Sequence, residues 1–445
     1  MKTPICDFLQ EYLASDPLRL HMPGHKGVGE LGVEGLDITE ICGADDLYAP
    51  TGIIGESEEN AAQLFGSART LYSTEGSSQC IRAMLYLARL HALRIGRSPR
   101  ILAARNVHTT FLSAVGLLDM EVEWIPSRPN DTYLSFSPDW DALEELLAKE
   151  PPVAVYVTSP DYLGNCLPLE RLSCLCHRHG ALLLVDNAHG AYLKFLEEPR
   201  HPLDLGADLC CDSAHKTLPA LTGAAYLHLA LTAPEGMAEE AKDAMALFGS
   251  TSPSYLILRS LDRLNPYLAK EFPATLARFL PLLEDYKRRW VRLGYRFVGN
   301  EPLKLTLDAK SFGYLGTDLA RLLREQNIEC EFADPDFLVL MPSCKLGAEG
   351  LERLSHTLTE IPKKESITER PPAPLSLPRV LSIREAMLSP WRWVSLEEAH
   401  GRVLATLSLS CPPAVPIAVC GERLNEDALK SFRYYGIEGC RVVCQ

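Results

Sequence analysis

The fold is decided by two stretches near the middle of the chain, Leu182-Leu183-Leu184-Val185-Asp186-Asn187-Ala188-His189-Gly190 and Leu209-Cys210-Cys211-Asp212-Ser213-Ala214-His215-Lys216-Thr217. Each is a short apolar run that ends in polar groups. A wholly apolar run of this length fits a strand in a sheet that is covered on both faces. The first run ends at Asp186 and the second leads to Lys216, so a carboxylate and an amine each follow a predicted buried strand.

Apolar runs of this kind recur between residues 65 and 230, where they alternate with helix-like stretches. They occupy residues 100–104, 153–157, 181–185, 209–212 and 224–229. Residues 139–149 form one helix-like stretch, and Ser137-Pro138-Asp139 is its start signal. Such alternation predicts an α/β fold with parallel strands and crossover helices.

Ligands of open α/β sheets bind beyond the carboxyl ends of the strands. His108, Ser159, Asp186 and Lys216 each follow one of the apolar runs. We therefore expect these four side chains to share one pocket.

Enzymes that use pyridoxal 5'-phosphate (PLP) need an amine, a carboxylate for the ring nitrogen, a flat group against the ring, and an anion site. Lys216, flanked by Ser213 and His215, is the predicted imine lysine, and a surface lysine is the alternative interpretation. Asp186 is the predicted partner of the ring nitrogen, and capping of a turn is its alternative role.

The phosphate site is predicted at Ser73-Thr74-Glu75-Gly76-Ser77-Ser78, which precedes the helical pattern of residues 79–91. Small residues at a helix start direct backbone N–H groups toward an anion, so we expect Gly76, Ser77 and Ser78 to bind the phosphate. Ser213 and His215 are possible further donors. Taken alone, the segment would only cap a helix. His108 is the predicted flat group, with an ordinary loop histidine as the alternative.

Length and composition exclude several classes of protein. A chain of 445 residues predicts two or three domains. A net charge of −14 argues against nucleic acid or an anionic membrane as partner. No apolar run approaches the roughly 18 to 20 residues of a membrane span. The chain has 14 cysteines and no secretory signal at its N-terminus, so we expect reduced thiols and a cytoplasmic protein.

Three other segments carry residues that bind ligands in other proteins. Residues 174–179 (Cys-Leu-Cys-His-Arg-His) lie on a predicted helix, where such close neighbours point apart, so we expect no zinc site. Residues 45–52 lack the ligand spacing of a calcium loop. We expect no metal. Residues 21–27 (His-Met-Pro-Gly-His-Lys-Gly) suggest a tight loop near an anionic ligand, or else an exposed basic turn.

At this point the residues resemble the bacterial Orn/Lys/Arg decarboxylases of PLP fold type I. The resemblance is carried by five separated motifs in residues 21–27, 45–54, 186–190, 213–222 and 251–262. It implies a large PLP-binding domain of the aspartate-aminotransferase type with a mainly parallel sheet, then a smaller α+β domain and a small C-terminal domain. The expected boundaries are 1–254, 255–360, a proline-rich linker at 361–378, and 379–445.

The resemblance also implies the roles of the site residues. Lys216 would be the Schiff-base lysine, Asp186 and His189 would bind the cofactor, and His108 would lie against its ring. Positions around the phosphate match Ser77, Ser78, Ser213 and His215. It further implies a homodimer or higher even oligomer whose active sites are shared, with residues 251–255 reaching the neighbouring subunit. The chain begins almost at the first motif, so we expect the short, biosynthetic form without an N-terminal wing domain.

The sequence departs from the family pattern in several places. Glu75 stands where Asn is usual, Asn187 where Glu is usual, and Gly223 where Gln is usual. Thr109-Thr110 replaces Lys-Ser after His108. In the C-terminal region, residues 411–416 and 419–422 keep only part of the pattern.

The predicted function is α-decarboxylation of a basic L-amino acid, giving CO2 and an amine of polyamine biosynthesis. Lys216 or His215 would return a proton to the α-carbon. Two alternatives stay open. One is another PLP reaction, such as transamination or side-chain lyase chemistry, and the other is a degenerate paralogue that binds PLP without turnover.

Overall fold

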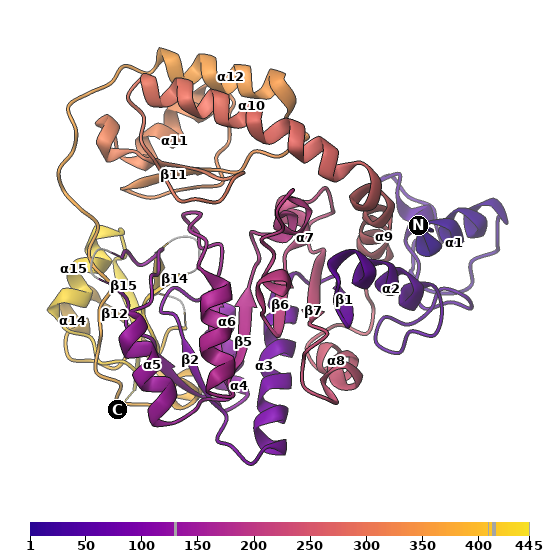
Figure 1. Cartoon of the computed structure of the whole chain (residues 1–445), viewed down its shortest axis with the longest axis horizontal. Helices are drawn as coiled ribbons and strands as arrows, with labels where there is room; N and C mark the ends of the chain where they lie inside the picture. The colour runs from indigo at the N-terminus through magenta and orange to yellow at the C-terminus, as the bar shows by residue number, and fades with distance from the viewer. Residues whose placement is uncertain (129–130, 408, 412–414, 445) are drawn as a thin grey trace. The chain divides into compact units, whose positions relative to one another are not determined.

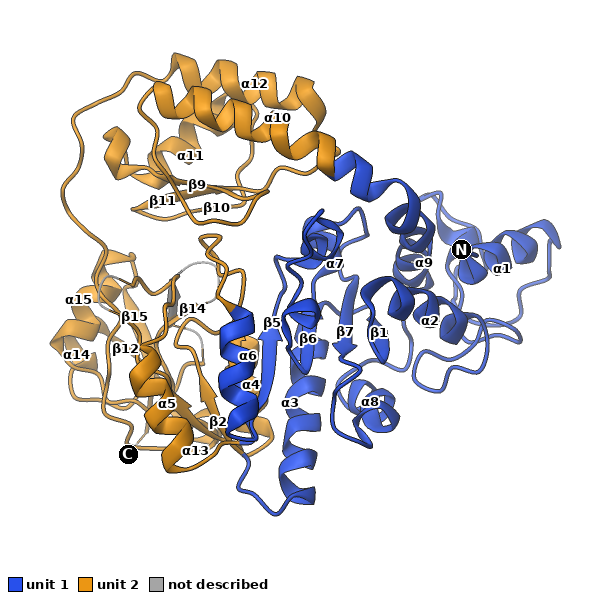
Figure 2. Cartoon of the chain, viewed as in Figure 1, with its two compact units in different colours: residues 1–99, 153–155, 169–276 blue, residues 100–152, 156–168, 277–445 orange. Residues whose placement is uncertain are grey.

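The computed structural model describes residues 1–128, 131–407, 409–411 and 415–444 (Figure 1). The chain divides into two compact units (Figure 2). Unit 1 comprises residues 1–99, 153–155 and 169–276, and unit 2 comprises residues 100–152, 156–168 and 277–445. Both units are discontinuous in sequence. The four-part domain division expected from the sequence therefore stays a prediction.

The main sheet has seven strands in the order β1-β7-β6-β5-β4-β2-β3. The strands are β1 (Arg69–Ser73), β2 (Arg100–Ala103), β3 (Glu121–Trp124), β4 (Ala154–Thr158), β5 (Leu182–Asp186), β6 (Leu209–Asp212) and β7 (Ala225–Leu229). The sheet is mostly parallel, as expected. The five predicted runs all became strands, with ends shifted by a residue or so.

The expectation of parallel strands is wrong for β7, which pairs antiparallel with both β6 and β1. The connection between β6 and β7 contains only the four-residue helix α7 (Ala214–Thr217), which is too short to run back along the sheet as a parallel crossover requires. The apolar-run criterion also missed β1 and the edge strand β3. In β3, exposed Glu121 and Glu123 interrupt the apolar pattern.

Helices cover the strands of unit 1. The helices of this unit are α1 (Pro4–Ala14), α2 (Ile53–Phe65), α3 (Ser77–Arg94), α6 (Leu169–Arg178), α7 (Ala214–Thr217), α8 (Met237–Ala246) and α9 (Tyr255–Lys270). Helix α3 packs on β6 and β7, and α2 packs on β1. All residues of β5, β6 and β7 are buried, which explains their mainly apolar sequence, interrupted in β7 by the buried His228.

Unit 2 holds the strands β2 and β3 and most of the second half of the chain. Its helices are α4 (Thr109–Leu117), α5 (Trp140–Lys149), α11 (Gly316–Glu325), α12 (Gly347–Glu360), α13 (Ile383–Leu388), α14 (Leu396–Ala399) and α15 (Glu426–Tyr434), together with most of α10 (Phe272–Arg292). The start signal predicted for α5 is confirmed, because the Asp139 side chain accepts a hydrogen bond from the Ala142 N–H.

Residues 297–340 of unit 2 contain a four-stranded antiparallel sheet, in the order β10-β11-β9-β8. Its strands are β8 (Phe297–Val298), β9 (Leu305–Asp308), β10 (Phe332–Ala333) and β11 (Phe337–Leu340). Helices α10 and α12 run side by side above it (Figure 1), and the Trp290 indole N–H joins them by donating to the Ser355 hydroxyl at 3.2 Å.

The C-terminal region is built from two small antiparallel ladders. They are formed by β12 (Trp391–Ser395) with β15 (Gly439–Val443), and by β13 (Leu409–Cys411) with β14 (Val415–Ala418). Their core includes the buried Ile417, Phe432 and Val442. Of the motif at residues 411–416, positions 412–414 lie outside the described residues.

Candidate functional site

The site forms at one edge of the main sheet in unit 1, because the strand register brings four chain segments together there. In the parallel pair β5–β6, Asp186 is opposite Cys211. In the antiparallel pairs, Asp212 is opposite Tyr226, and Ser73 is opposite Ala225. The carboxyl ends of β1, β5 and β6 and the start of β7 therefore share an edge. The loops that carry the predicted cofactor residues of unit 1 all begin or end at this edge.

Lys216 and the segment after β5 meet directly. The Lys216 Nζ lies 3.0 Å from the His189 Nε2. Lys216 itself is exposed, whereas Asp186 and His189 are 3% and 5% exposed. The Asp186 carboxylate accepts from the Ala188 N–H at 3.1 Å, and the Cys211 thiol lies 3.8 Å from the same oxygen. A buried carboxylate and an amine that contacts an imidazole thus occupy adjacent strand ends.

The predicted phosphate cradle lies where β1 gives way to α3. Gly76 has φ = 73°, a left-handed conformation that glycine adopts without strain, and the 18-residue helix α3 starts immediately after it. Ser77 and Ser78 occupy its first turn. The Ser213 hydroxyl donates to the Ser77 hydroxyl at 2.9 Å, so the segment after β6 reaches the start of α3. Hydroxyls and free N–H groups at a helix N-terminus form a site suited to an anion.

Two of the departures from the family pattern have local explanations here. The exposed Glu75 carboxylate accepts from the Ser250 N–H at 2.5 Å, so it ties down another loop. Gly223 has φ = 95°, and its carbonyl accepts from the Gly76 N–H at 2.7 Å. A Cβ at position 223 would lie 2.8 Å from the Thr74 carbonyl oxygen, so a longer side chain would force the cradle to move.

His215 lies close to Lys216 in sequence but is held by the opposite segment. Its Nδ1–H donates to the Ala224 carbonyl at 2.9 Å. This bond places the proton of a neutral ring on Nδ1 and leaves Nε2 as the acceptor. His215 thus has one ring nitrogen committed to the fold and the other available for chemistry.

His108 belongs to unit 2, where it is the N-cap of α4. Its Nδ1 accepts from the Thr110 N–H at 3.1 Å and lies 2.9 Å from the Thr110 hydroxyl. His108 is exposed. The predicted stacking role of His108 stays a prediction, and so does the presence of Ser159 in the same pocket.

An ion pair that the sequence reasoning missed lies three residues before His108. The Arg105 guanidinium donates to both carboxylate oxygens of Glu422, at 3.2 and 2.9 Å. Burial raises the pKa of Glu422, and the nearby Arg105 only partly offsets this. Both side chains are largely buried. From sequence, Glu422 is noted only within the partly matching segment 419–422, because pairing of residues so far apart leaves no local signal.

The N-terminal motif forms a self-contained loop. The His25 Nδ1 accepts from the Gly27 N–H, and its Nε2 therefore carries a proton and donates to Asp37 at 3.1 Å. The Lys26 ammonium donates to the His21 carbonyl at 2.6 Å. Each of these polar groups thus has a partner within residues 21–37.

Asp45 caps the start of α2. This capping role, rather than calcium binding or a simple turn, accounts for the residue. Its carboxylate accepts from the backbone N–H groups of Thr51, Gly52, Ile54 and Gly55. Burial tends to raise the pKa of Asp45, but these donors outweigh it and hold the pKa below its usual value. The Tyr255 hydroxyl contacts the carbonyls of Ala44 and Asp45, so the start of α9 is bound to this loop.

Among the described residues, one group has the ligand types and proximity to hold a metal: His201, Cys210 and Asp212, all buried. Burial raises the pKa of the Cys210 thiol well above its usual value, and a protonated thiol is a poor ligand. The helix that carries Cys174 and Cys176 contributes no such group within the described chain. The expectation of a metal-free protein stays a prediction.

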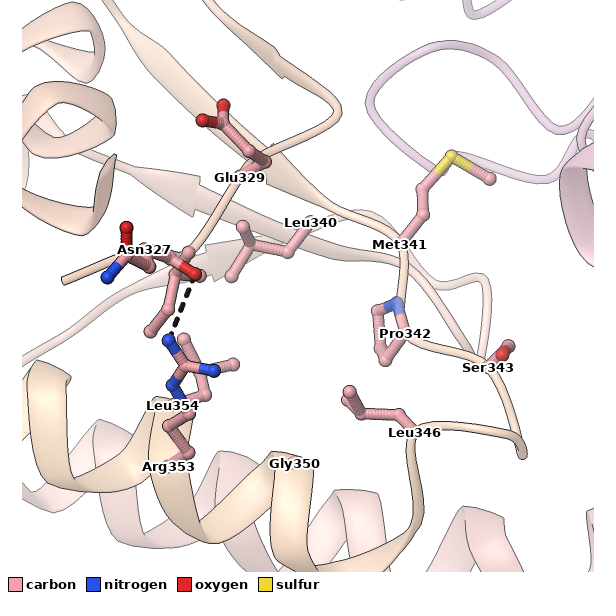
Figure 3. Close-up of a pocket in the computed structure, with 11 residues that line it drawn as sticks. Asn327, Glu329, Leu340, Met341, Pro342, Ser343, Leu346, Gly350, Arg353 and Leu354 are labelled. Atoms are coloured by element: carbon pink, nitrogen blue, oxygen red, sulfur yellow. Dashed lines mark hydrogen bonds between the residues drawn. The ribbon is translucent and has the colours of Figure 1, made fainter. Parts of the chain in front are cut away.

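A separate cavity of about 390 Å³ lies in unit 2 between β11 and α12 (Figure 3). Leu340, Met341 and Leu346 line it, and the Arg353 guanidinium donates to the Asn327 carbonyl at 3.1 Å. None of the predicted site residues lines this cavity.

The residues of unit 1 fit PLP. They supply an amine, a buried carboxylate one strand away, and hydroxyls at the start of a long helix, which are three of the four groups that the cofactor needs. No helix in the described part of the chain combines the length and apolarity needed to cross a bilayer.

Comparison with solved structures identifies the class of fold. The constitutive lysine decarboxylase of E. coli superposes with a TM-score of 0.80 at 18% identity, covering 100% of this chain and 82% of that one. An alanine–glyoxylate aminotransferase from Nostoc sp. matches with a TM-score of 0.54 at 18% identity, over 69% of this chain and 86% of that one. The fold is PLP fold type I, as predicted.

Sequence comparison then identifies the family. The model for the Orn/Lys/Arg decarboxylase major domain matches residues 3–272, and the model for the C-terminal domain of that family matches residues 375–438. The chain belongs to the Orn/Lys/Arg decarboxylase family, as the sequence motifs indicated.

Two curated relatives match nearly end to end. The arginine decarboxylase of Bacillus subtilis is 28% identical, over 96% of this chain and 92% of its own length. The arginine decarboxylase of Halalkalibacterium halodurans is 29% identical, over 97% and 93%. The predicted class of enzyme, an amino-acid decarboxylase, is confirmed.

Proposed function

We propose that this protein removes the α-carboxyl group of a basic L-amino acid with PLP as cofactor, and that arginine is its substrate. The observation that carries the proposal is the meeting of the Lys216 amine with His189 at the strand end that also bears the buried Asp186. In sequence, arginine is the substrate named for four curated relatives that match 94–97% of the chain, whereas the lysine decarboxylase LdcA of Pseudomonas aeruginosa matches 58% of it.

The chain's own residues supply the framework for this chemistry. When bound, PLP provides an electron sink for the electrons left by the departing carboxyl group. Lys216 would hold the cofactor covalently, and His189 is placed to exchange a proton with its Nζ. Asp186 would keep a proton on the ring nitrogen, since a buried carboxylate stabilises a neighbouring cation. Ser77, Ser78, Ser213 and the first N–H groups of α3 would hold the phosphate.

A proton must be returned to the α-carbon after CO2 leaves. Lys216 and His215 are the two candidates, as the sequence suggested. His215 donates through Nδ1 to the Ala224 carbonyl, so a neutral ring would need to be protonated on Nε2 before it could act as the acid. Lys216, released as an amine when substrate takes its place, would likewise have to gain a proton, and His189 lies 3.0 Å from its Nζ to supply one, so we propose Lys216 as the donor.

The degenerate-paralogue alternative was motivated by Glu75, Asn187 and Gly223. Each of these residues makes a hydrogen bond that fits its surroundings, and the amine, carboxylate and hydroxyl set is complete. These contacts favour an active enzyme. Transamination or lyase chemistry needs the same cofactor groups, so the products must discriminate.

The test is a panel of arginine, lysine and ornithine with purified protein and added PLP. We expect a visible absorbance band of lysine-bound PLP, CO2 release, and the matching amine identified by mass, with arginine fastest. Lys216→Ala should lose the band and the activity. A protein that stays colourless with PLP, or that forms keto acid in place of CO2, would contradict the proposal.

Assembly and compartment belong to the same proposal. We infer a homodimer or higher even oligomer with shared active sites, working in the cytoplasm. None of the thirteen cysteines whose side chains are described forms a disulfide, which fits a reducing compartment.

A further inference from the structure

A cluster of four polar side chains is completely buried in unit 1, behind the ends of β5 and β6. His201, Asp212, His228 and Asn187 are each 0% exposed. The Asp212 Oδ2 lies 3.1 Å from the Nε2 of His201 and 3.1 Å from the Nε2 of His228. The Asp212 Oδ1 accepts from the Asn187 amide at 2.6 Å. The sequence reasoning missed this cluster, apart from noting Asn187.

The hydrogen-bond pattern defines the charge of the cluster. An ionised carboxylate only accepts, so both histidines donate through Nε2–H. The His201 Nδ1 accepts from the Leu203 N–H at 3.4 Å. Burial lowers the pKa of His228, whose Nδ1 lies 2.8 Å from the Thr70 hydroxyl. Burial alone would raise the pKa of Asp212, but the two imidazoles outweigh it and hold it below its usual value. Asp212 is thus a buried anion with three hydrogen-bond donors.

This anion is joined directly to the proposed cofactor residues. Asp212 is the last residue of β6, and the segment from Ser213 to Lys216 starts at the next position. Asn187 follows Asp186, and its backbone N–H donates to the Cys211 carbonyl at 3.0 Å. Asn187 therefore joins the ends of β5 and β6 twice, once through its backbone and once through its side chain.

We propose that Asp212, held by His201, His228 and Asn187, is a positioning residue that sets the spacing between Asp186 and Lys216. The inference rests on the proposed function, because this spacing matters only if both groups hold one cofactor. Asp212 touches neither substrate nor cofactor in this role. It acts through the two strand ends, which it holds in register.

The same contacts explain why an amide occupies position 187. A carboxylate there would face the Asp212 oxygen at about the distance of the present hydrogen bond, and two buried anions so close repel strongly. An amide donates a hydrogen bond to that oxygen. Asn187 and Asp212 form a matched pair, in which the amide and the carboxylate could be exchanged but the carboxylate could not be duplicated.

The test uses isosteric variants of the full-length protein. Asn187→Asp duplicates the carboxylate, Asp212→Asn duplicates the amide, and the double variant Asn187→Asp/Asp212→Asn exchanges them. In the exchange, the amide introduced at position 212 can accept from both histidines through its oxygen and donate to the carboxylate introduced at position 187. Thr70→Val is a milder variant, which removes only the hydroxyl partner of His228 and keeps the test open if a duplicated pair prevents folding.

The matched control is Glu58→Gln. Glu58 is also buried in unit 1, where it accepts from the Lys242 ammonium at 2.6 Å and from the Tyr72 N–H at 2.8 Å, away from the β5 and β6 ends. It undergoes the same change from carboxylate to amide. Two quantities are measured for every protein: the melting temperature without cofactor, and the dissociation constant of PLP from an absorbance titration.

We expect Asn187→Asp to weaken PLP binding about tenfold or more, the equivalent of one lost buried hydrogen bond. Asp212→Asn should weaken it less, because Asn187 can turn its amide and accept through its Oδ1, which is unpartnered within the described part of the chain. The exchange variant should recover most of that loss. Glu58→Gln should lower the melting temperature and leave PLP binding of the folded protein as in the wild type. Variants of the pair that melt earlier but bind PLP as the wild type does would overturn the inference alone. Wild-type protein that takes up no PLP would overturn the proposed function and the inference together.

Discussion

At the scale of single residues, the N–H donors around each acidic group determine the direction in which its pKa shifts. Asp45 and Asp212 are surrounded by N–H donors, which hold their pKa values below the usual range. Asp334 is as buried as Asp212 but receives fewer donors, and its Oδ2 has no hydrogen-bond partner among the described residues. Burial raises the pKa of Asp334 to about 6. Carboxylates of one residue type therefore affect stability in opposite directions.

Asp334 yields a prediction about stability and pH. The pKa of this carboxyl is ordinarily 3.8 and is about 6 in the folded chain, so between pH 4 and 6 the folded state binds a proton that the unfolded state has lost. This group therefore makes the protein less stable as pH rises through that window. Asp334→Asn removes the effect, and we expect the variant to gain about 1–3 kcal/mol relative to wild type between pH 4 and pH 7.

The measurement is urea unfolding of both proteins across that pH range. Asn can still accept through one oxygen from the Phe337 and Asp336 N–H groups that Asp334 now serves. A difference between the two proteins that does not change with pH would contradict the prediction.

At the scale of elements, capping residues determine where helices start. Helix α2 begins after Gly52, and the Asp45 carboxylate reaches its first N–H groups from a loop seven residues earlier. Helix α5 begins after Asp139, in the ordinary manner of an N-cap. The Asp139 cap of α5 can be predicted from the sequence because it is local. The Asp45 cap of α2 depends on how the loop before the helix folds back.

For α2 we predict a local loss of stability in Asp45→Asn. The change keeps a residue that tolerates the positive φ of 71° at this position but removes the anion at the helix N-terminus. The expected cost is about 1–2 kcal/mol for opening of the first turn, measured by hydrogen exchange of the Ile54 and Gly55 amides.

The sign of the pH effect is opposite to that of Asp334. Because the pKa of Asp45 is lowered in the folded chain, its stabilisation is present above its usual pKa and is lost as pH falls through the folded value. In Asp45→Asn, the protection of these amides, expressed as their exchange rate divided by the rate of the unfolded chain, should be the same at pH 4 and at pH 6. A wild-type-like rate at both pH values would contradict the capping role.

At the scale of the whole molecule, the C-terminal region is attached to the first half of unit 2 by polar contacts, of which the Arg105–Glu422 pair is buried. Besides the Arg105–Glu422 pair, the Arg379 guanidinium donates to the Val122 carbonyl and Arg384 donates to the Gly116 carbonyl. These contacts anchor residues 379–445 to the strands and helix that follow residue 100. The region is therefore part of the compact unit that carries His108.

The Arg105–Glu422 pair yields a third prediction. Glu422→Gln leaves a mostly buried guanidinium without its counter-ion, and we expect a loss of about 3 kcal/mol in the free energy of unfolding. Arg105→Met/Glu422→Met removes both charges and should lose less than either single variant. Denaturant unfolding of the four proteins measures the coupling. Additive losses would show that the two groups act independently.

The surface of unit 1 bears on the proposed assembly. Residues 18–33 hold several large apolar side chains that are exposed in the single chain, with Leu20 at 84% and Leu31 at 81%. A concentration of exposed apolar groups in one segment is typical of an interaction surface. We expect Leu20→Asp/Leu31→Asp to shift the protein toward monomers.

Light scattering coupled to size-exclusion chromatography measures that shift. Leu231→Asp is the matched control, since Leu231 is 77% exposed in the same unit but lies outside the segment. An unchanged mass for the double variant, or an equal change in the control, would contradict the involvement of residues 18–33 in assembly.

Much of the fold and site could be predicted because the signals are local. An apolar run such as residues 182–185 identifies a buried strand wherever it lies, and its terminal Asp186 follows from the same few residues. The phosphate cradle is another local signal, since Gly76 and Ser77 form the start of the helix that they precede. Covalent order alone therefore places these groups at strand ends and helix starts.

Other features depend on partners that the chain brings together from afar. An apolar run carries no direction, so the antiparallel pairing of β7 could not be seen in residues 224–229. The bonds of Asn187 to Asp212 and of Arg105 to Glu422 depend on strand register and on packing of distant segments. Local sequence determines which chemical groups the protein contains and on which kind of element they lie. Which of those groups touch, and hence which are charged, follows from the long-range hydrogen bonds and burial that exist only once the chain has folded.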